Sequence, residues 1–228
     1  MYTDYYLFGQ TLIDKVAVMA SFKNKLTFSS EGEENLHQMV KDKTGGILIS
    51  AHLGNYELAG HALSIKTKIN IVLFEGEHAK IKQYLSGVKK ENSFNIIIVN
   101  DHSFDHIYKI NEAIERNEFI CIHGDRFVPG TKTVACPFLG QEARFPLGPF
   151  QLAAQLQVPV SFVYAVKEST YHYHFFASKP VTCVYQSNRQ LREAESLKVL
   201  HAYVDSLENI LKRFPTQWYN FYDFWSTN

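Results

Sequence analysis

The stretch GGILISAHLGNYE, residues 45–57, carries an apolar run directly into a group of polar residues, and it decides the fold prediction. The run GGILISA follows a pair of glycines and has the length and composition of a strand that is buried on both faces. Such strands belong mainly to parallel sheets, and open α/β proteins place their chemistry at the carboxyl ends of these strands. The polar residues from His52 to Glu57 are therefore the first candidate site.

The rest of the chain alternates helix-like and strand-like patterns, which predicts repeated β-α-β units. Such units form a mostly parallel sheet with helices on both faces. We therefore expect an α/β fold, with a mixed, largely parallel sheet flanked by helices on both faces and antiparallel pairs at one edge. The predicted strands are 45–51, 69–76, 95–100, 118–125, 159–168 and 171–178; the predicted helices are 4–21, 32–41, 56–63, 78–92, 105–117, 148–157 and 193–213.

Composition predicts a single domain over residues 1–228. The chain is 46% hydrophobic, which provides a sizeable core, and it contains no repeat and no Gly/Ser linker. An amphipathic helix at about 4–21 and an aromatic tail at about 214–228 mark the two ends. Lys+Arg and Asp+Glu balance at 23 each, which excludes a nucleic-acid function based on net charge. Three widely spaced cysteines argue against a disulfide framework and a structural zinc site.

No membrane-spanning or secretory segment is predicted. The N-terminus lacks the basic and long apolar regions of a secretory signal. Residues 145–166 contain no charge and are long enough to span a bilayer, but three prolines and three glutamines interrupt them. We interpret this segment as buried interior, and we expect reduced thiols in a cytosolic compartment.

The polar junction can support a histidine base. If Asn55 caps the following helix, Glu57 in its first turn can reach back to His52. A carboxylate on one ring nitrogen fixes the tautomer and makes the other nitrogen more basic. Gly54 allows close approach to the backbone, and the helix N-terminus offers amide donors to an anion. The alternative is purely structural, because an H-x-x-x-x-E string also occurs by chance.

Further histidines offer alternatives. His123 and Asp125 end another predicted strand, so together with His52 they could bind a metal ion in a hydrolase. His172 and His174 lie on one face of a predicted strand, and exposed positions on an edge strand explain them.

Three ordered blocks resemble one family. HLGNYE (52–57) resembles the H-x-x-x-x-[DE] motif of the lysophospholipid acyltransferase superfamily, and more narrowly that of the bacterial lipid A biosynthesis acyltransferases. GDRFVPGTKTVACPFLGQEARFPLGPFQLAAQLQVPV (124–160) resembles the family's second block, with its V-x-x-P-F-x-G hairpin. PTQWYNFYDFW (215–225) resembles its C-terminal block.

The resemblance implies acyl transfer by general-base catalysis. His52 would take a proton from an acceptor hydroxyl, and Glu57 would orient it. The hydroxyl would attack the thioester of an acyl carrier and release a free thiol. No cofactor and no metal are expected, and the cysteines need not take part.

The resemblance also implies a set of substrate-binding residues. Arg126 would pair with a phosphate of the acceptor or carrier, beside Asp125 in the second motif, and Arg144 is a weaker candidate for the same task. Two further groups are expected to line the site. They are Gly54 and Asn55 at the first motif, and Pro146, Gly148 and Pro149 in the turn beside the acyl pocket.

Partners and location follow from the same resemblance. The expected donor is an acyl carrier protein or acyl-CoA, and the expected acceptor is a lipid or glycolipid. We expect peripheral contact with the cytoplasmic face of the inner membrane, or a location in the bacterial cytoplasm if an anchor is absent. Family members commonly begin with a strongly apolar helix, which this chain lacks, and they usually have Leu where this chain has Phe145. A metal-dependent hydrolase and a non-catalytic lipid-binding module remain the alternatives.

Overall fold

The computed structural model describes most of the chain. The described residues are 2–19, 25–56, 58, 65–74, 94–99, 103–128, 130–184 and 186–225. Of the predicted helix 56–63, Tyr56 and Leu58 are described and are helical. The predicted helix 78–92 lies outside the described residues, and so does Glu57.

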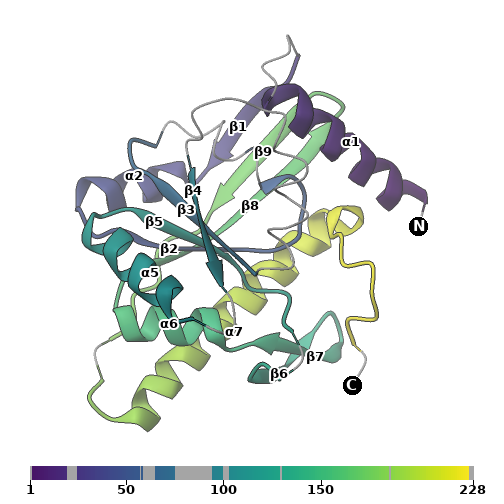
Figure 1. The fold of residues 1–228 in the computed structure, drawn as a ribbon. Coiled ribbons are helices and arrows are strands. Elements are labelled where there is room, and N and C mark those ends of the chain that lie inside the picture. Colours follow the sequence, from purple (N-terminus) through teal and green to yellow (C-terminus); the bar gives the residue numbers. More distant parts are fainter. Residues whose placement is uncertain are drawn as a thin grey trace.

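A seven-stranded mixed sheet forms the centre of the molecule (Figure 1). Its order is β1-β9-β8-β2-β5-β3-β4, and the strands from β8 to β4 run parallel to one another. At the other edge β9 is antiparallel to β8, and β1 is parallel to β9. The strands are β1 (Thr27–Glu31), β2 (Gly46–Ser50), β3 (Ile69–Phe74), β4 (Phe94–Val99), β5 (Phe119–His123), β8 (Val160–Ser169) and β9 (His172–Ala177).

Helices cover both faces of this sheet, which confirms the predicted fold class. The larger core cluster lies on the face covered by α5, α6 and α7, and the smaller cluster lies between the sheet and α2. This division follows from the pleat, since neighbouring residues of β2 such as Leu48 and Ile49 join different clusters. The helices are α1 (Tyr2–Met19), α2 (Glu33–Lys41), α5 (Asp105–Glu115), α6 (Gly148–Leu156) and α7 (Arg189–Arg213).

One sheet edge differs from the prediction. Residues 27–31 form β1, a strand that the polar sequence TFSSE does not suggest. Because β1 pairs with β9, the interpretation of His172 and His174 as exposed edge-strand positions is wrong. The predicted hairpin is confirmed as β6 (Thr133–Phe138) and β7 (Gln141–Pro146), a separate two-stranded sheet.

The central register brings the two predicted strand ends together. β2 and β5 pair in parallel, with Ser50 opposite His123. His52 and Asp125 each follow two residues later, so both leave the sheet at the same rim.

The C-terminal segment closes over this rim. After the short helix η1 (Pro215–Gln217), the amide of Tyr219 donates to the carbonyl of His52, and Gly54 donates to the carbonyl of Gln217, both at 2.9 Å. The buried Gln217 side chain also bonds both backbone groups of Lys167 in β8. The predicted aromatic tail thus packs against the residues that follow β2, from His52 to Gly54.

Helix α1 is fastened to the same region. Lys167 and Tyr173, both buried, bond the Asp14 carboxylate from the sheet. Asn55 donates its side-chain amide to the carbonyl of Thr11 at 2.9 Å. Within the described part of the chain, no helix combines the length and apolar character that a membrane crossing requires.

Gly54→Ala is expected to destabilise the fold strongly. A Cβ at this position would lie 1.9 Å from the carbonyl oxygen of Ala165, and φ is +62°. Left-handed backbone and overpacking together predict a loss of about 2–5 kcal/mol in the free energy of unfolding, measured in urea. Gly130→Ala is the matched control, because its φ is +86° but a Cβ there meets nothing within 4 Å. Equal losses in the two variants would contradict the close approach to β8.

Candidate active site

His52 and Asp125 form a direct side-chain pair. The Nδ1 atom of His52 lies 2.8 Å from Oδ1 of Asp125, and the backbone amide of His52 donates to Oδ2 at 3.0 Å. The Asp125 carboxylate is completely buried, whereas the His52 side chain keeps 14% of its surface exposed. Asp125 therefore holds the His52 ring from the interior, and only the imidazole of His52 reaches the surface.

The pair fixes the tautomer of His52. An ionised carboxylate can only accept hydrogen bonds, so Nδ1 of His52 carries the proton. In the neutral ring, Nε2 then carries the lone pair. This is the state that a general base requires, and the carboxylate also stabilises the imidazolium that forms after proton transfer.

Two residues of the C-terminal segment complete the shell around Asp125. The indole Nε1 of Trp218 donates to Oδ2 at 3.0 Å, and Nδ2 of Asn220 donates to the same oxygen at 3.2 Å. Burial by itself raises the pKa of Asp125. The hydrogen bond and charge of His52 outweigh that effect, with further contributions from His123 and Trp218, and hold the pKa well below its usual range. Asp125 therefore stays ionised.

Aromatic contacts support the imidazole from the side. The ring centroids of His52 and His123 are 4.2 Å apart, and the Tyr56 ring meets His123 edge-on at 4.3 Å. His123 comes from the end of β5 and Tyr56 from the segment after β2, so both strand ends contribute. These contacts restrict rotation of the His52 ring.

Arg126 lies next to the pair and faces the C-terminal segment. Its Nε donates to Oδ1 of Asn220 and its Nη2 to the carbonyl of Tyr219, both at 2.7 Å. Its guanidinium also lies 5.9 Å from the ring centroid of Tyr222. Arg126 thus orients the amide that donates to Asp125, while its predicted contact with a substrate phosphate stays a prediction.

Gly54 and Asn55, both predicted to bind substrate, are buried in the junction. Their backbone amides donate to the carbonyls of Gln217 and Ala165 at 2.9 and 2.8 Å. The close backbone approach at Gly54 is made by β8, and the Asn55 side chain bonds α1. In this structure both residues fix the backbone that follows His52.

The remaining predicted residues belong to the β7–α6 region. Arg144 is exposed on β7 and donates to the hydroxyl of Thr133 at 3.2 Å. Pro146 is buried at the end of β7, while Gly148 and Pro149 begin α6. The described contacts do not join these four residues to the His52–Asp125 pair, and their substrate-binding role stays a prediction.

The sequence did not single out Trp218 and Asn220, although both lie in the C-terminal block. Their dense aromatic context signalled packing, and only the fold brings them to Asp125. Glu57 lies outside the described residues, so its contact with His52 stays a prediction.

His52, His123 and Asp125 do not form a metal-ligand cluster in the part of the chain that is described. In that part of the chain, the side chains whose ligand atoms converge are Glu168, His172 and His174, at β8–β9. Both Asp125 oxygens are also engaged by N–H donors. The described geometry therefore favours an acid–imidazole pair over the metal site of a hydrolase.

Comparison with known proteins adds a family. The model of a family described as bacterial lipid A biosynthesis acyltransferase matches residues 4–227. No curated protein gives a significant match. Among solved structures, the 1-acyl-sn-glycerophosphate (LPA) acyltransferase PlsC from Thermotoga maritima is similar, with a TM-score of 0.42 and 16% identity over 90% of this chain and 80% of that chain. The family match includes His52, Asp125 and the C-terminal segment.

Trp218→Phe is expected to weaken the fold by removing a donor from a buried carboxylate. A hydrogen bond to a charged group contributes about 1.5–3 kcal/mol, so the free energy of unfolding should fall by about that much more than in Trp225→Phe. Trp225 is the matched control, because its buried indole N–H has no hydrogen-bond partner among the described residues. If chemical denaturation gives the two variants the same loss, the Trp218 N–H does not stabilise Asp125.

Proposed function

The chain belongs to the family of bacterial lipid A biosynthesis acyltransferases, and from that premise we propose that His52 catalyses transfer of a fatty acyl chain from an acyl thioester to a hydroxyl of a lipid or glycolipid. Membership supports acyl transfer to lipid in general. The catalytic role of His52, the thioester donor and the kind of acceptor belong to the proposal. The observation that carries it is the 2.8 Å contact between His52 Nδ1 and the buried Asp125 carboxylate.

The proposed reaction is a single acyl transfer without a covalent enzyme intermediate. Nε2 of His52 takes the proton of the acceptor hydroxyl, and the oxygen attacks the thioester carbonyl. The C–O bond forms and the C–S bond breaks, and the proton passes from the imidazolium to the departing sulfur. The products are an ester and a free thiol. Asp125 orients the neutral ring and stabilises the imidazolium that forms between the two proton transfers, as expected of a buried orienting carboxylate.

The three cysteines take no part in the proposed reaction. Burial raises the pKa of the Cys121 thiol to about 12, and burial also raises the pKa of the Cys136 and Cys183 thiols. A thiol with a raised pKa is a poor nucleophile at neutral pH.

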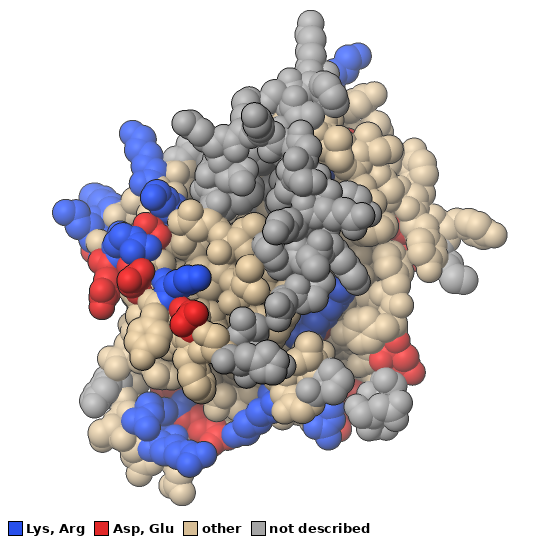
Figure 2. Space-filling view, viewed as in Figure 1, with Lys and Arg blue, Asp and Glu red and all other residues tan. Residues whose placement is uncertain are grey.

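We further propose that α1 meets a membrane surface at the cytoplasmic face of the inner membrane. Its outward face repeats apolar side chains at helical spacing, which is typical of a helix lying at a lipid interface. Figure 2 shows that the charged residues of this view gather over the α2 and α5 side and the lower edge, whereas the surface over α1 is mostly uncharged. The exposed side chains are Tyr2, Tyr5, Tyr6, Leu12, Ile13 and Val16.

Replacement of the base is expected to abolish turnover. A positioned general base typically contributes about 100- to 10,000-fold, so His52→Ala should lose at least about 100-fold in kcat, and Asp125→Asn should lose a similar factor. Purified protein is incubated with acyl carrier protein thioester or acyl-CoA and a hydroxyl-bearing lipid, and mass spectrometry follows acceptor-dependent ester formation. The donor that supports turnover identifies the carrier.

His37→Gln is the control for this experiment, since His37 is a half-exposed histidine on α2 that pairs with Glu33. It should retain full activity. Glu57→Gln, tested beside Asp125→Asn, compares the carboxylate of the motif with the one that contacts His52. Normal turnover in His52→Ala would exclude the mechanism, and normal turnover in Asp125→Asn would exclude Asp125 as the orienting acid.

Charges on the exposed face of α1 are expected to release the protein from lipid. Burying an apolar side chain contributes about 1.5–3 kcal/mol, so Ile13→Glu should weaken vesicle binding by roughly tenfold or more. Flotation with phosphatidylethanolamine–phosphatidylglycerol vesicles measures the bound fraction. Phe104→Glu is the control, because Phe104 is 80% exposed at the start of α5. Equal loss in both variants, or none in Ile13→Glu, would rule out α1 as the contact.

A further inference from the structure

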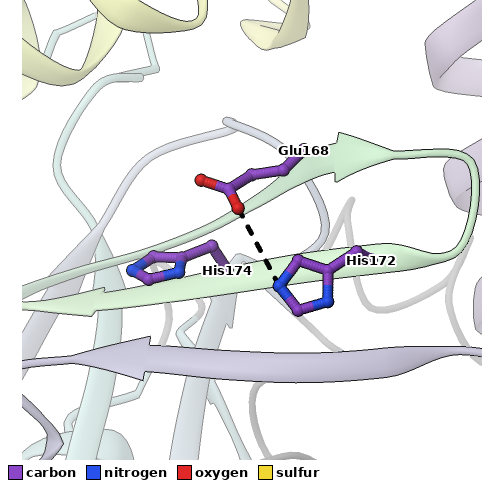
Figure 3. A group of neighbouring side chains, drawn as sticks. All are labelled: Glu168, His172 and His174. Atoms are coloured by element: carbon purple, nitrogen blue, oxygen red, sulfur yellow. Dashed lines mark ion pairs between the residues drawn. The ribbon is translucent and has the colours of Figure 1, made fainter.

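A second group of histidines lies at the β8–β9 hairpin, away from the His52–Asp125 pair. Glu168, His172 and His174 each offer one ligand atom, and these atoms all lie within 4.8 Å of one another (Figure 3). Their side chains are 37%, 31% and 18% exposed, so the group is accessible from solvent while being partly enclosed. Among the described residues, this is the group of three or more His, Cys, Asp or Glu side chains whose ligand atoms lie close enough to share a metal ion.

Local structure explains why the three side chains share a face. His172 and His174 are two residues apart on β9, and alternate residues of a strand point to the same side. The β8–β9 register shifts between Lys167 and Ser169, so Glu168 has no partner across the ladder. A bulge of this kind re-aims a side chain, and here it leaves the carboxylate beside the His172 ring.

Strand β1 contributes the rest of the surroundings. The hydroxyl of Ser29 lies 2.8 Å from Nε2 of His172 and 2.7 Å from Nδ1 of His174, so two imidazole nitrogens from β9 point at one small group. The hydroxyl of Thr27 bonds Nδ1 of His172 at 2.8 Å and orients that ring. Each imidazole is therefore held with a nitrogen directed toward the Ser29 oxygen.

The carboxylates approach the imidazoles without hydrogen bonding to them. Oε2 of Glu168 lies 3.8 Å from Nε2 of His172, and Oε2 of Glu31 lies 4.0 Å from Nε2 of His174. Both distances exceed a normal hydrogen bond. Glu168 thus lies beside the nitrogen of His172 that faces Ser29, whereas Glu31 lies beside the other nitrogen of His174. The Glu168 carboxylate and the two imidazole nitrogens that meet Ser29 form a donor set for a cation.

We propose that Glu168, His172 and His174 bind a divalent transition-metal ion of the zinc type. Imidazole nitrogen together with carboxylate oxygen suits zinc, whereas calcium and magnesium prefer oxygen ligands alone. The ion takes the place of the Ser29 hydroxyl between the two rings, after that hydroxyl rotates away. A water molecule supplies the fourth ligand of a tetrahedral site.

The site joins two neighbouring strands next to the edge of the sheet. Glu168 belongs to β8, and the two histidines belong to β9, the strand that pairs with the edge strand β1. An ion that binds the folded chain and not the unfolded one stabilises the fold by mass action. The expected role is therefore structural, and it does not depend on the acyl transfer proposed above.

The test is zinc binding to the full chain after metal removal. Isothermal titration calorimetry in excess magnesium should give one zinc ion per chain, and zinc should raise the Tm. Loss of an outer-sphere partner already costs about 10- to 100-fold in metal affinity, so Glu168→Gln and His172→Asn should each cost at least as much. His37→Gln, at an exposed His–Glu pair on α2, should bind zinc as tightly as the unaltered chain.

Two further variants decide between sites. Ser29→Ala should retain zinc binding, because the ion replaces its hydroxyl; loss of binding there would overturn the proposed position. His52→Asn should also retain binding, since a loss would assign the ion to the acyl-transfer site. The proposal fails if zinc does not bind, or if it binds equally well after both Glu168→Gln and His172→Asn. Metal-free thermal unfolding confirms that each variant is folded.

Discussion

The buried carboxylate of Asp125 is the constraint on which the candidate site depends. An ionised carboxylate in the interior is costly unless hydrogen bonds compensate for its lost hydration. Here the compensation comes from His52 and from two residues near the C-terminus, Trp218 and Asn220. Removing any one donor leaves charge uncompensated, so these segments must come together for the fold to hold the acid. The same requirement positions the imidazole.

This requirement couples the C-terminus of the chain to its central strand. The carbonyl of His52 accepts from Tyr219, and Arg126 bonds both Tyr219 and Asn220. Arg126 directly follows Asp125 in the sequence. The turn after β5 therefore supplies both the buried carboxylate and the cation that holds its donor Asn220 in place. The geometry of the His52 imidazole is therefore set by residues more than a hundred positions apart, and the sheet register between β2 and β5 is what permits it.

The sequence revealed the sheet because its inner strands are apolar and bounded by polar turns. It located His52 and Asp125 at strand ends, and it predicted Glu57, the nearest acid along the chain, as the partner of His52. That contact stays a prediction, since Glu57 lies outside the described residues. Strand order cannot be read from periodicity, and only the adjacency of β2 and β5 shows that Asp125 reaches the imidazole. β1 was missed for a different reason: TFSSE lacks apolar alternation, since its Ser29 hydroxyl meets two imidazoles from β9.

The two histidine groups differ in a way that indicates different tasks. At His52 a fully buried carboxylate lies within hydrogen-bond distance of one nitrogen, which fixes a tautomer with the lone pair on the other nitrogen. At His172 and His174 the carboxylates stand 3.8 and 4.0 Å away, and inner nitrogens from both rings meet a hydroxyl. The first arrangement stabilises a proton on the imidazole. The second directs one nitrogen of each ring at a common point, and that is the geometry in which a cation competes with a proton.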